Sequence, residues 1–345
     1  MKIVICSGGT GGHMFPACAL FTAVRKKGHG VTMVTDGRGE VFCADISPKI
    51  VLNTVRFSYR KILAIMLDFA HTFLKFFRLW RKESPDVIVG FGGILTVIPP
   101  LVGKILGSRV IIYEQNAIIG RANKFLEKFA DLKLSTFELG GEWIEIAAPV
   151  REEFSRCGRP YECEGNINIL VLGGSQGAAS FTKIIPEALS LIDERERKSI
   201  EITQQTGKGN IEELRNLYEN IGIKSTLKEF IQNVAEVMAT AQLVICRSGA
   251  STLSELATTG RPAILIPYPN SSKDHQLHNA VYYQGKKAAW VLEEKEGIAS
   301  ELAEIIMEVL QNRELLKSAA YNMMRSSAGR AVDDFVKLIE KTYSG

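Results

Sequence analysis

Two glycine-rich turns of the same kind constrain the fold of this chain more than any other feature. One is Gly-Gly-Thr-Gly-Gly at residues 8–12, and the other is Gly-Gly-Ser-Gln-Gly at residues 173–177. Each turn follows a short apolar run and precedes a stretch with helical spacing. A buried strand, a tight turn and a helix open a doubly wound α/β domain, where backbone N–H groups bind phosphate or another anion. The chain therefore predicts two Rossmann-like domains that face each other across a ligand cleft.

The length and the order of the predicted elements fit this division. A chain of 345 residues is long enough for two domains with separate cores. Short β-branched runs alternate with helical stretches, which predicts parallel sheets covered by helices. The expected strands are residues 3–6, 31–35, 87–90, 110–113, 132–135, 169–172, 200–204, 226–230, 243–246, 263–266 and 289–292.

The domain boundary is expected in the charged segment 149–165, which shows no periodicity. The tail at 298–343 is expected to be helical, with a break near 326–329. We therefore expect one domain at residues 1–150 and a second at 151–326. The remaining residues, 327–345, are expected to form a helix that packs back on the first domain.

Composition excludes several classes of protein. The formal net charge of +4 is too small to predict binding to nucleic acid. Six cysteines without a Cys-x-x-Cys pair argue against a zinc site and favour a reduced, cytosolic protein. No apolar run is long enough to cross a bilayer and no signal-peptide pattern is present, so a membrane would be contacted from one side.

The first glycine turn does not match the nicotinamide-dinucleotide fingerprint. That fingerprint requires Gly-x-Gly-x-x-Gly/Ala, and here Met14 occupies the position of the last glycine. Asp36 follows the second predicted strand, where an acid that binds ribose would belong. A single acid at the end of a strand is more often a turn residue, and we interpret Asp36 in this way.

His13 is the candidate catalytic residue. It follows the glycines, and Pro16 suits the first turn of a helix, which would place His13 at or next to the helix N-terminus. The helix dipole disfavours an imidazolium there, so His13 is expected to be neutral near pH 7, as a general base must be. The residues alone leave open a histidine that only caps the turn. Thr10, Gly11 and Gly12 are candidate substrate-binding residues, because glycine lets the backbone approach a ligand closely.

Several segments taken together resemble the MurG family, the bacterial glycosyltransferases that add N-acetylglucosamine to the lipid-linked muramyl-pentapeptide of peptidoglycan synthesis. The resemblance covers nearly the whole chain. It rests on residues 8–16 (Gly-Gly-Thr-Gly-Gly-His-x-x-Pro), 114–116 (Glu-Gln-Asn), 149–151 (Pro-Val-Arg), 173–177, 247–250 (Arg-Ser-Gly-Ala) and 273–276 (Lys-Asp-x-Gln). The family has the GT-B fold, in which the first Rossmann-like domain binds the acceptor and the second binds the nucleotide sugar.

The resemblance implies a role for each matching residue. Ser175 and its loop would bind the diphosphate of a UDP-sugar, Ile231 would meet the uracil through its backbone, and Glu255 would bind both ribose hydroxyls. Gln276 would bind the sugar hydroxyls. The remaining substrate-binding positions are Asn116, Arg151, Ala250, Ser251 and Thr252.

The chain departs from the family pattern at two places. Residues 147–148 are Ala-Ala where the family often has Gly-Asn, and Leu277 stands where a second glutamine is common. The second departure puts part of the sugar recognition in doubt. His275 and His278 are spaced as metal ligands could be, but their neighbours are assigned to sugar binding, so no metal and no cofactor are expected.

The segment 60–82 is the clearest signal for a partner. It contains two apolar stripes at helical spacing, flanked by Lys75, Arg78, Arg81 and Lys82, whereas a single core needs one stripe. The surplus predicts a surface that touches anionic lipid, and residues 94–98 could extend it. A helix buried on two sides is the alternative. The resemblance implies a peripheral protein on the cytoplasmic face of the bacterial inner membrane.

The resulting hypothesis is a metal-independent, inverting transferase. The C4 hydroxyl of the muramyl sugar would attack the anomeric carbon of UDP-N-acetylglucosamine, with His13 as the base. Three alternatives stay open at this point: a UDP-N-acetylglucosamine epimerase of the same fold, a glycosyltransferase with another lipid acceptor, and a non-catalytic membrane adaptor. The Glu-Gln-Asn match argues against the epimerase, and the glycine loops with Glu255 and Gln276 argue against the adaptor.

Overall fold

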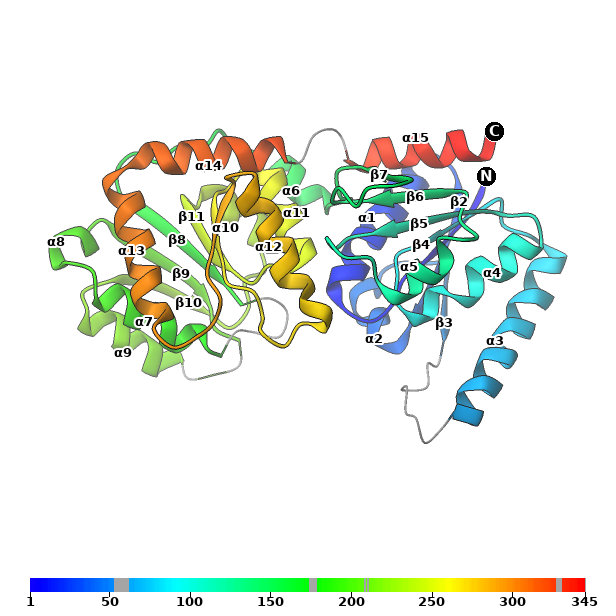
Figure 1. The fold of residues 1–345 in the computed structure, drawn as a ribbon, viewed down its shortest axis with the longest axis horizontal. Helices are drawn as coiled ribbons and strands as arrows, with labels where there is room; N and C mark the ends of the chain where they lie inside the picture. Colours follow the sequence, from blue (N-terminus) through cyan, green and yellow to red (C-terminus); the bar gives the residue numbers. More distant parts are fainter. Residues whose placement is uncertain (53–61, 174–178, 208, 210, 327–330, 345) are drawn as a thin grey trace. The chain divides into compact units, whose positions relative to one another are not determined.

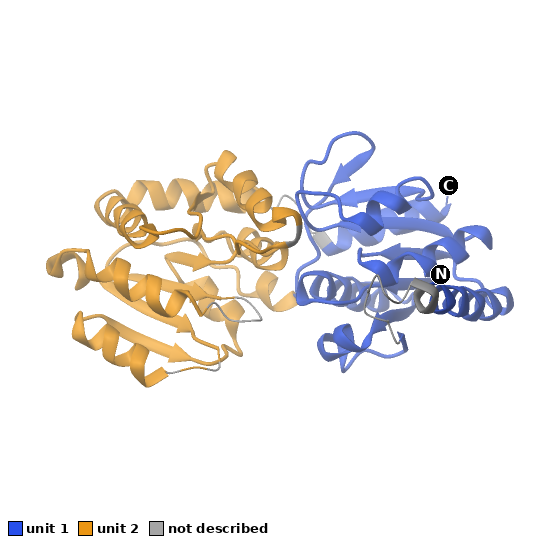
Figure 2. Ribbon diagram, turned by 60° about the horizontal axis from the view of Figure 1, so that its bottom comes forward, with its two compact units in different colours: residues 1–151, 329–345 blue, residues 152–328 orange. Residues whose placement is uncertain are grey.

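The chain forms two compact units in a computed structural model that describes residues 1–52, 62–173, 179–207, 209, 211–326 and 331–344. Unit 1 comprises Met1–Arg151 together with Gly329–Gly345, and unit 2 comprises Glu152–Ala328 (Figure 2). Each unit is built around one parallel sheet with helices on both faces (Figure 1). The architecture is the doubly wound α/β fold expected twice from the sequence.

The sheet of unit 1 has seven parallel strands. Their spatial order is β3 (Lys49–Leu52), β2 (Gly30–Asp36), β1 (Lys2–Cys6), β4 (Val87–Gly90), β5 (Arg109–Glu114), β6 (Leu132–Ser135) and β7 (Trp143–Glu145). The chain first builds outward from β1 to β3 and then crosses to β4 on the other side of β1. The loops that follow β1 and β4 therefore diverge at a topological switch point, the usual ligand site of such sheets.

Helices cover both faces of this sheet because alternate side chains of each strand point to opposite faces. Ile3 and Ile5 pack in the core on one face, whereas Val4 and Cys6 pack on the other. The first face is covered by α1 (Gly11–Lys26) and the C-terminal α15 (Ala331–Ser344). The second face is covered by α3 (Ile62–Lys82), α4 (Ile98–Ile105) and α5 (Arg121–Leu126). Shorter helices are α2 (Gly37–Glu40), η1 (Val41–Cys43) and η3 (Ile94–Thr96).

The sheet of unit 2 has six parallel strands. Their order is β10 (Lys224–Lys228), β9 (Ile200–Gln205), β8 (Ile167–Leu172), β11 (Leu243–Cys246), β12 (Ala263–Leu265) and β13 (Ala289–Val291). The switch point lies between β8 and β11. The helices are α6 (Glu152–Arg156), α7 (Phe181–Ser190), α8 (Glu194–Arg197), α9 (Ile211–Asn220), α10 (Val234–Thr240), α11 (Ala250–Thr259), η4 (Ser272–Asp274), α12 (His275–Gly285), α13 (Ile298–Gln311) and α14 (Arg313–Arg325).

Every strand expected from the sequence is present, and two were missed. The missed strands are β3 and β7, both at the edges of the unit 1 sheet. The expected strand at 226–230 is shifted, because β10 ends at Lys228 and Phe230 lies beyond it. The segment 149–165, in which the domain boundary was expected, contains the short helix α6. The tail is helical as expected, with a further break at Asn312 between α13 and α14.

Candidate functional site

The first glycine turn joins β1 to α1 at the switch point of unit 1. Gly9 has φ +88°, in the left-handed region that favours glycine. A methyl group on Gly8 would lie 3.2 Å from Oδ1 of Asp36. Thr10 caps α1 in an extended conformation, and its carbonyl oxygen accepts from the N–H groups of His13 and Met14, both at 3.1 Å. The turn therefore needs glycine for its conformation and for the close approach of Asp36.

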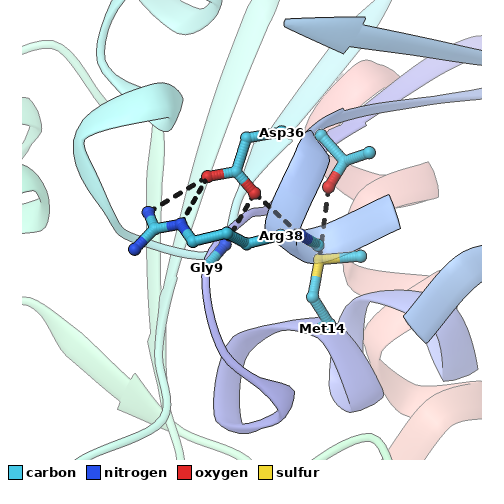
Figure 3. Close-up of polar contacts among 6 residues, drawn as sticks. Gly9, Met14, Asp36 and Arg38 are labelled. Atoms are coloured by element: carbon cyan, nitrogen blue, oxygen red, sulfur yellow. Dashed lines mark hydrogen bonds and ion pairs between the residues drawn. The ribbon is translucent and has the colours of Figure 1, made fainter. Parts of the chain in front are cut away.

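Asp36 holds this turn in place (Figure 3). Its Oδ1 accepts from the N–H of Gly9 at 3.0 Å and from the N–H of Gly39 at 2.8 Å, and Nη2 of Arg38 donates to Oδ2 at 3.1 Å. Burial raises the pKa of this carboxyl, but the two amides and Arg38 together hold the pKa below its usual range. Asp36 is therefore a turn residue, as interpreted from the sequence.

His13 lies in the first turn of α1, at its third residue. A methyl group on Gly92, in the loop after β4, would lie 3.5 Å from both Nε2 of His13 and Nδ2 of Asn123. The imidazole is half-buried and stands beside the diverging loops of the switch point. The expectation for Pro16 was wrong, because Pro16 is the sixth residue of α1 and lies in its second turn.

Glu114 organises the loop after β5. Its side chain is 2% exposed, and Oε1 accepts from the backbone N–H of Asn116 at 3.1 Å and from its Nδ2 at 3.2 Å. Oε2 accepts from the N–H of Gly120 at 2.8 Å and from Nδ2 of Asn123 at 2.9 Å. Burial raises the pKa of Glu114, and these four N–H donors oppose that rise. The Glu-Gln-Asn motif thus fixes a loop and brings Asn123 next to His13.

Arg151 is the last residue of the first of the two segments that form unit 1. Its guanidinium carbon lies 4.8 Å from the centroid of the Phe15 ring, a cation–π contact. Phe15 follows His13 by two residues on α1 and packs edge-on against Phe42, with the ring centroids 5.4 Å apart. Arg151 is therefore held beside the first turns of α1.

In unit 2, Arg247 ties together the segments around the end of β11. Its Nη1 donates to the carbonyl oxygens of Ile266 at 3.2 Å and Pro267 at 3.1 Å, beyond β12. Its Nη2 donates to Oγ of Ser180 at 3.0 Å and forms an ion pair with Oε2 of Glu294 at 2.6 Å. The segment before α7, the segment after β12 and the segment after β13 are thereby fixed to one side chain.

Aromatic rings enclose the same guanidinium. Its carbon lies 4.7 Å from the centroid of the Phe181 ring and 5.5 Å from that of the Tyr268 ring. Arg247 is only 8% exposed, so these contacts operate away from bulk water. Arg247 belongs to a motif in the sequence, but no role was predicted for it from that motif.

Gln276 lies in the first turn of α12, next to the end of β11. Its Oε1 accepts from the N–H of Tyr268 at 2.9 Å, and its carbonyl oxygen accepts from Oγ of Ser248 at 2.7 Å. The residues before α12, Lys273 and Asp274, have positive φ angles of 54° and 52°. Non-glycine residues in this region are strained, and such strain occurs mainly at ligand sites and switches.

Glu255 is a buried residue of α11 and does not lie on the solvent-exposed surface of that helix. It is 8% exposed. The pKa of Cys246 is raised to about 12 by burial first and then by the negative charge of Glu255, which agrees with a carboxylate turned toward the end of β11. Ala250, Ser251 and Thr252 form the first turn of the same helix, where N–H groups point outward. The structure thus brings these four residues together.

Ile231 and Ser175 were both expected to bind the UDP-sugar. Ile231 is 1% exposed, so its side chain belongs to the core. Ile231 lies three residues beyond β10 and not at the strand end itself. Ser175 lies outside the residues that the structure describes.

The outer face of α3 is apolar and exposed. The exposed apolar side chains of α3 are Met66 (62%), Leu67 (63%), Leu74 (49%) and Leu79 (44%), and of these Leu67 and Leu74, seven residues apart, share the outer face. Phe76 and Trp80 instead pack in the core, so the helix buries one face only and the alternative of a helix buried on two sides is wrong. In the expected extension at 94–98, Ile94 is exposed, whereas Leu95 and Ile98 are buried. That extension was therefore wrong for most of its length.

Within the part of the chain that the structure describes, no helix is both long and apolar enough to cross a membrane. Within the same residues, no group of three or more His, Cys, Asp or Glu side chains is arranged to hold a metal ion.

Sequence reasoning missed Asn123 and Gly92 as neighbours of His13. Gly92 lies in the loop after β4 and Asn123 lies in α5, so no local motif links them to the glycine turn. The only available signal was their position after predicted parallel strands, whose carboxyl ends share one edge of a sheet.

Comparison with known proteins places this geometry in a family. Residues 3–134 match the glycosyltransferase family 28 N-terminal domain, and residues 168–339 match the glycosyltransferase family 28 C-terminal domain. A Wolbachia pipientis protein named UDP-N-acetylglucosamine--N-acetylmuramyl-(pentapeptide) pyrophosphoryl-undecaprenol N-acetylglucosamine transferase is 31% identical, over 100% of both chains. A Rhodospirillum rubrum protein of the same name is 35% identical, over 93% of this chain and 86% of its own.

A solved structure is similar to this chain over its whole length, in agreement with these relatives. The crystal structure of Acinetobacter baumannii MurG superimposes with a TM-score of 0.84 at 26% identity, covering 99% of this chain and 100% of that one. The two parallel sheets and the two family domains agree with the GT-B fold. The chain belongs to glycosyltransferase family 28 and, within it, to the MurG family of N-acetylglucosaminyltransferases.

Proposed function

We propose that this chain transfers N-acetylglucosamine from UDP-N-acetylglucosamine to the C4 hydroxyl of undecaprenyl-pyrophosphoryl-N-acetylmuramyl-pentapeptide. The observation that carries this proposal is the full-length similarity to relatives named for that transfer. The arrangement around the two switch points supports it, because each unit gathers polar groups at the edge where such sheets bind ligands. The product is the disaccharide-linked lipid used in peptidoglycan synthesis.

In the mechanism that we propose, His13 is the general base. The C4 oxygen of the muramyl sugar attacks the anomeric carbon and gives its proton to the imidazole as the new C–O bond forms. The bond between the anomeric carbon and the diphosphate oxygen breaks in the same displacement, which inverts the configuration. Thr10, Gly11 and Gly12 lie where their backbone can approach the acceptor, and such a base typically contributes about 10²–10⁴ in rate.

Unit 2 would bind the donor. Glu255 accepts from both ribose hydroxyls in this proposal, and the amide NH2 of Gln276 donates to a sugar hydroxyl while its Oε1 stays on the N–H of Tyr268. Ile231 would meet the uracil through its backbone. The N–H groups at the start of α11, at Ala250, Ser251 and Thr252, supply positive potential to the leaving diphosphate.

The roles of three other residues follow from the resemblance. Ser175 would bind the diphosphate with its loop. Asn116 and Arg151 match positions that contact the donor in the family. Both side chains are held in place: Nδ2 of Asn116 donates to Glu114, and the guanidinium of Arg151 is stacked on the ring of Phe15.

We also propose that the outer face of α3 binds the anionic surface of the inner membrane from the cytoplasm. The exposed Leu67 and Leu74 lie on this face, and basic residues flank its C-terminal half. An amphipathic surface of this kind enters the headgroup region of a bilayer. A substrate with a polyprenyl tail requires an enzyme that works at such a surface.

The alternatives predict different products. An epimerase would convert UDP-N-acetylglucosamine without an acceptor, and a transferase for another lipid would ignore the muramyl-pentapeptide. The relatives named for transfer favour neither alternative.

The direct test is transfer of labelled N-acetylglucosamine to the lipid-linked muramyl-pentapeptide, with a control that lacks the acceptor. Labelled disaccharide-lipid that forms only with the acceptor is the expected result. Sugar isomerisation or UDP release without the acceptor would contradict the proposal. An inactive chain that still binds UDP-N-acetylglucosamine would contradict the acceptor assignment alone.

A further inference from the structure

The C-terminal helix α15 places an aromatic ring against the two strands that carry the candidate acceptor site. The ring of Phe335 lies 5.4 Å from that of Tyr113 and 6.1 Å from that of Phe91, between centroids. Phe91 and Tyr113 lie 5.1 Å apart in an edge-to-face arrangement. All three side chains are fully buried, so they form a closed aromatic cluster of unit 1.

Each partner of Phe335 is directly followed by a residue of the site. Phe91 precedes Gly92, against which the His13 imidazole lies. Tyr113 precedes Glu114, and its own carbonyl oxygen accepts from Nδ2 of Asn123 at 3.0 Å. The aromatic cluster therefore supports both loops next to His13 from the core side.

The position of α15 is itself fixed at several points. Val336 and Ile339 pack in the same core as Phe335. Near the end of the helix, Oε1 of Glu340 lies 2.9 Å from Nε2 of His29, in the turn after α1. The helix is thus held by contacts at three positions that follow Phe335, namely Val336, Ile339 and Glu340.

We propose that Phe335 is a positioning residue for the acceptor site. It acts through Phe91 and Tyr113 on the backbone at Gly92 and Asn123, and so on the place and orientation of the His13 imidazole. Because a protein core is densely packed, removal of a ring shifts the side chains around it. Even a small displacement of a catalytic group lowers the rate of the reaction. This inference rests on the proposed function of His13.

The test compares Phe335→Leu with variants of Ile339, which is equally buried on the same helix. Ile339→Val should lower Tm less than Phe335→Leu does, and Ile339→Ala should lower it more, so one of them serves as a control of similar stability. Phe335→Met is the second variant if Phe335→Leu does not fold. We expect kcat for lipid-linked muramyl-pentapeptide to fall roughly tenfold in the Phe335 variants, with an unchanged Kd for UDP. The Ile339 variant of matched Tm should keep its kcat.

Histidine side-chain NMR supplies a readout that does not depend on turnover. The His13 ring resonances, identified by their loss in His13→Gln, should shift in Phe335→Leu and stay in place in Ile339→Val. Equal losses of kcat at equal Tm in both series, or unmoved His13 resonances, would overturn the proposal. If the wild-type chain transfers no sugar, the proposed function fails, while the resonances still decide the role of Phe335.

Discussion

Arg247 and Glu294 form a partly buried ion pair, with Nη2 and Oε2 only 2.6 Å apart, on the side of unit 2 where the strands end. The same guanidinium binds Ser180, which precedes α7, and two carbonyl oxygens that precede Tyr268. Tyr268 in turn donates its N–H to Gln276. One side chain thus joins the segment before α7 to the segment that positions the candidate sugar-binding glutamine.

We expect Arg247→Lys to weaken the binding of UDP-N-acetylglucosamine, although Arg247 is not proposed to contact this substrate itself. Lysine keeps the charge but cannot bond the four oxygen atoms that the planar guanidinium reaches or stack between two rings. The KM for UDP-N-acetylglucosamine should rise about tenfold or more, with a smaller effect on the KM for the lipid acceptor. Arg215→Lys, on the exposed face of α9, is the matched control and should be neutral.

A double-mutant cycle checks the pair itself. Glu294→Gln should raise the same KM, and the double variant should be no worse than Arg247→Lys alone. A coupling energy of about 1 kcal/mol or more is expected for groups in one network. Strictly additive effects on KM would show that Arg247 and Glu294 act separately.

Replacement of His13 tests the candidate base. His13→Ala should lower kcat by about 10²–10⁴ and leave the Kd for UDP-N-acetylglucosamine unchanged, because the imidazole acts on the acceptor hydroxyl. Thr22→Ala is a suitable control, since Thr22 is an exposed residue of the same helix and lies beyond its first turn. Full turnover by His13→Ala would remove His13 from the mechanism.

Local patterns were enough to predict most of the fold. The strands around Ile5 and Ile169 are apolar on both faces and are followed by glycine-rich turns, which identifies buried parallel strands. The strands β3 and β7 were missed because edge strands carry mixed sequences with only weak burial signals. Pro16 was misplaced for a related reason, since a helix start depends on the capping geometry at Thr10 and not on the nearest proline.

The candidate site was predicted only in part. Motifs led to His13 and Glu255 because their neighbours in the sequence are also their neighbours in the fold. Arg247 and Phe335 act through contacts with distant segments, and such contacts leave no local pattern. Leu95 and Ile98 were assigned to the surface because an apolar run alone does not tell which face of η3 and α4 meets the sheet.

The Asp36 carboxylate predicts a pH-dependent contribution to stability. Its pKa in the folded protein lies below the unfolded value of about 3.9, so its contribution is complete above that value and is lost as the pH falls through the folded pKa. Asp36→Ala should cost about 2–3 kcal/mol near pH 7, because two buried N–H groups lose their acceptor. Denaturant unfolding of both proteins should show this difference shrinking between about pH 4 and pH 2. A difference that is constant over this range would contradict the assignment.

The exposed face of α3 predicts how the protein binds membranes. Leu67→Gln with Leu74→Gln removes two apolar side chains that are 63% and 49% exposed, so the fold should be unaffected. Binding to vesicles with anionic lipid should weaken roughly tenfold, because apolar burial in the headgroup region is lost. High salt should weaken wild-type binding as well, since Lys75 and Arg78 lie on the same helix.

The matched control for this prediction replaces equally exposed leucines in unit 2. Leu191→Gln with Leu217→Gln changes side chains that are 53% and 40% exposed and should leave vesicle binding as it is. Co-sedimentation with the vesicles measures both pairs, and transfer to an acceptor with a short, water-soluble lipid should stay normal in both. If the two double variants bind vesicles equally well, the outer face of α3 is not the membrane contact, because a surface that inserts into lipid must lose affinity when its apolar side chains become polar.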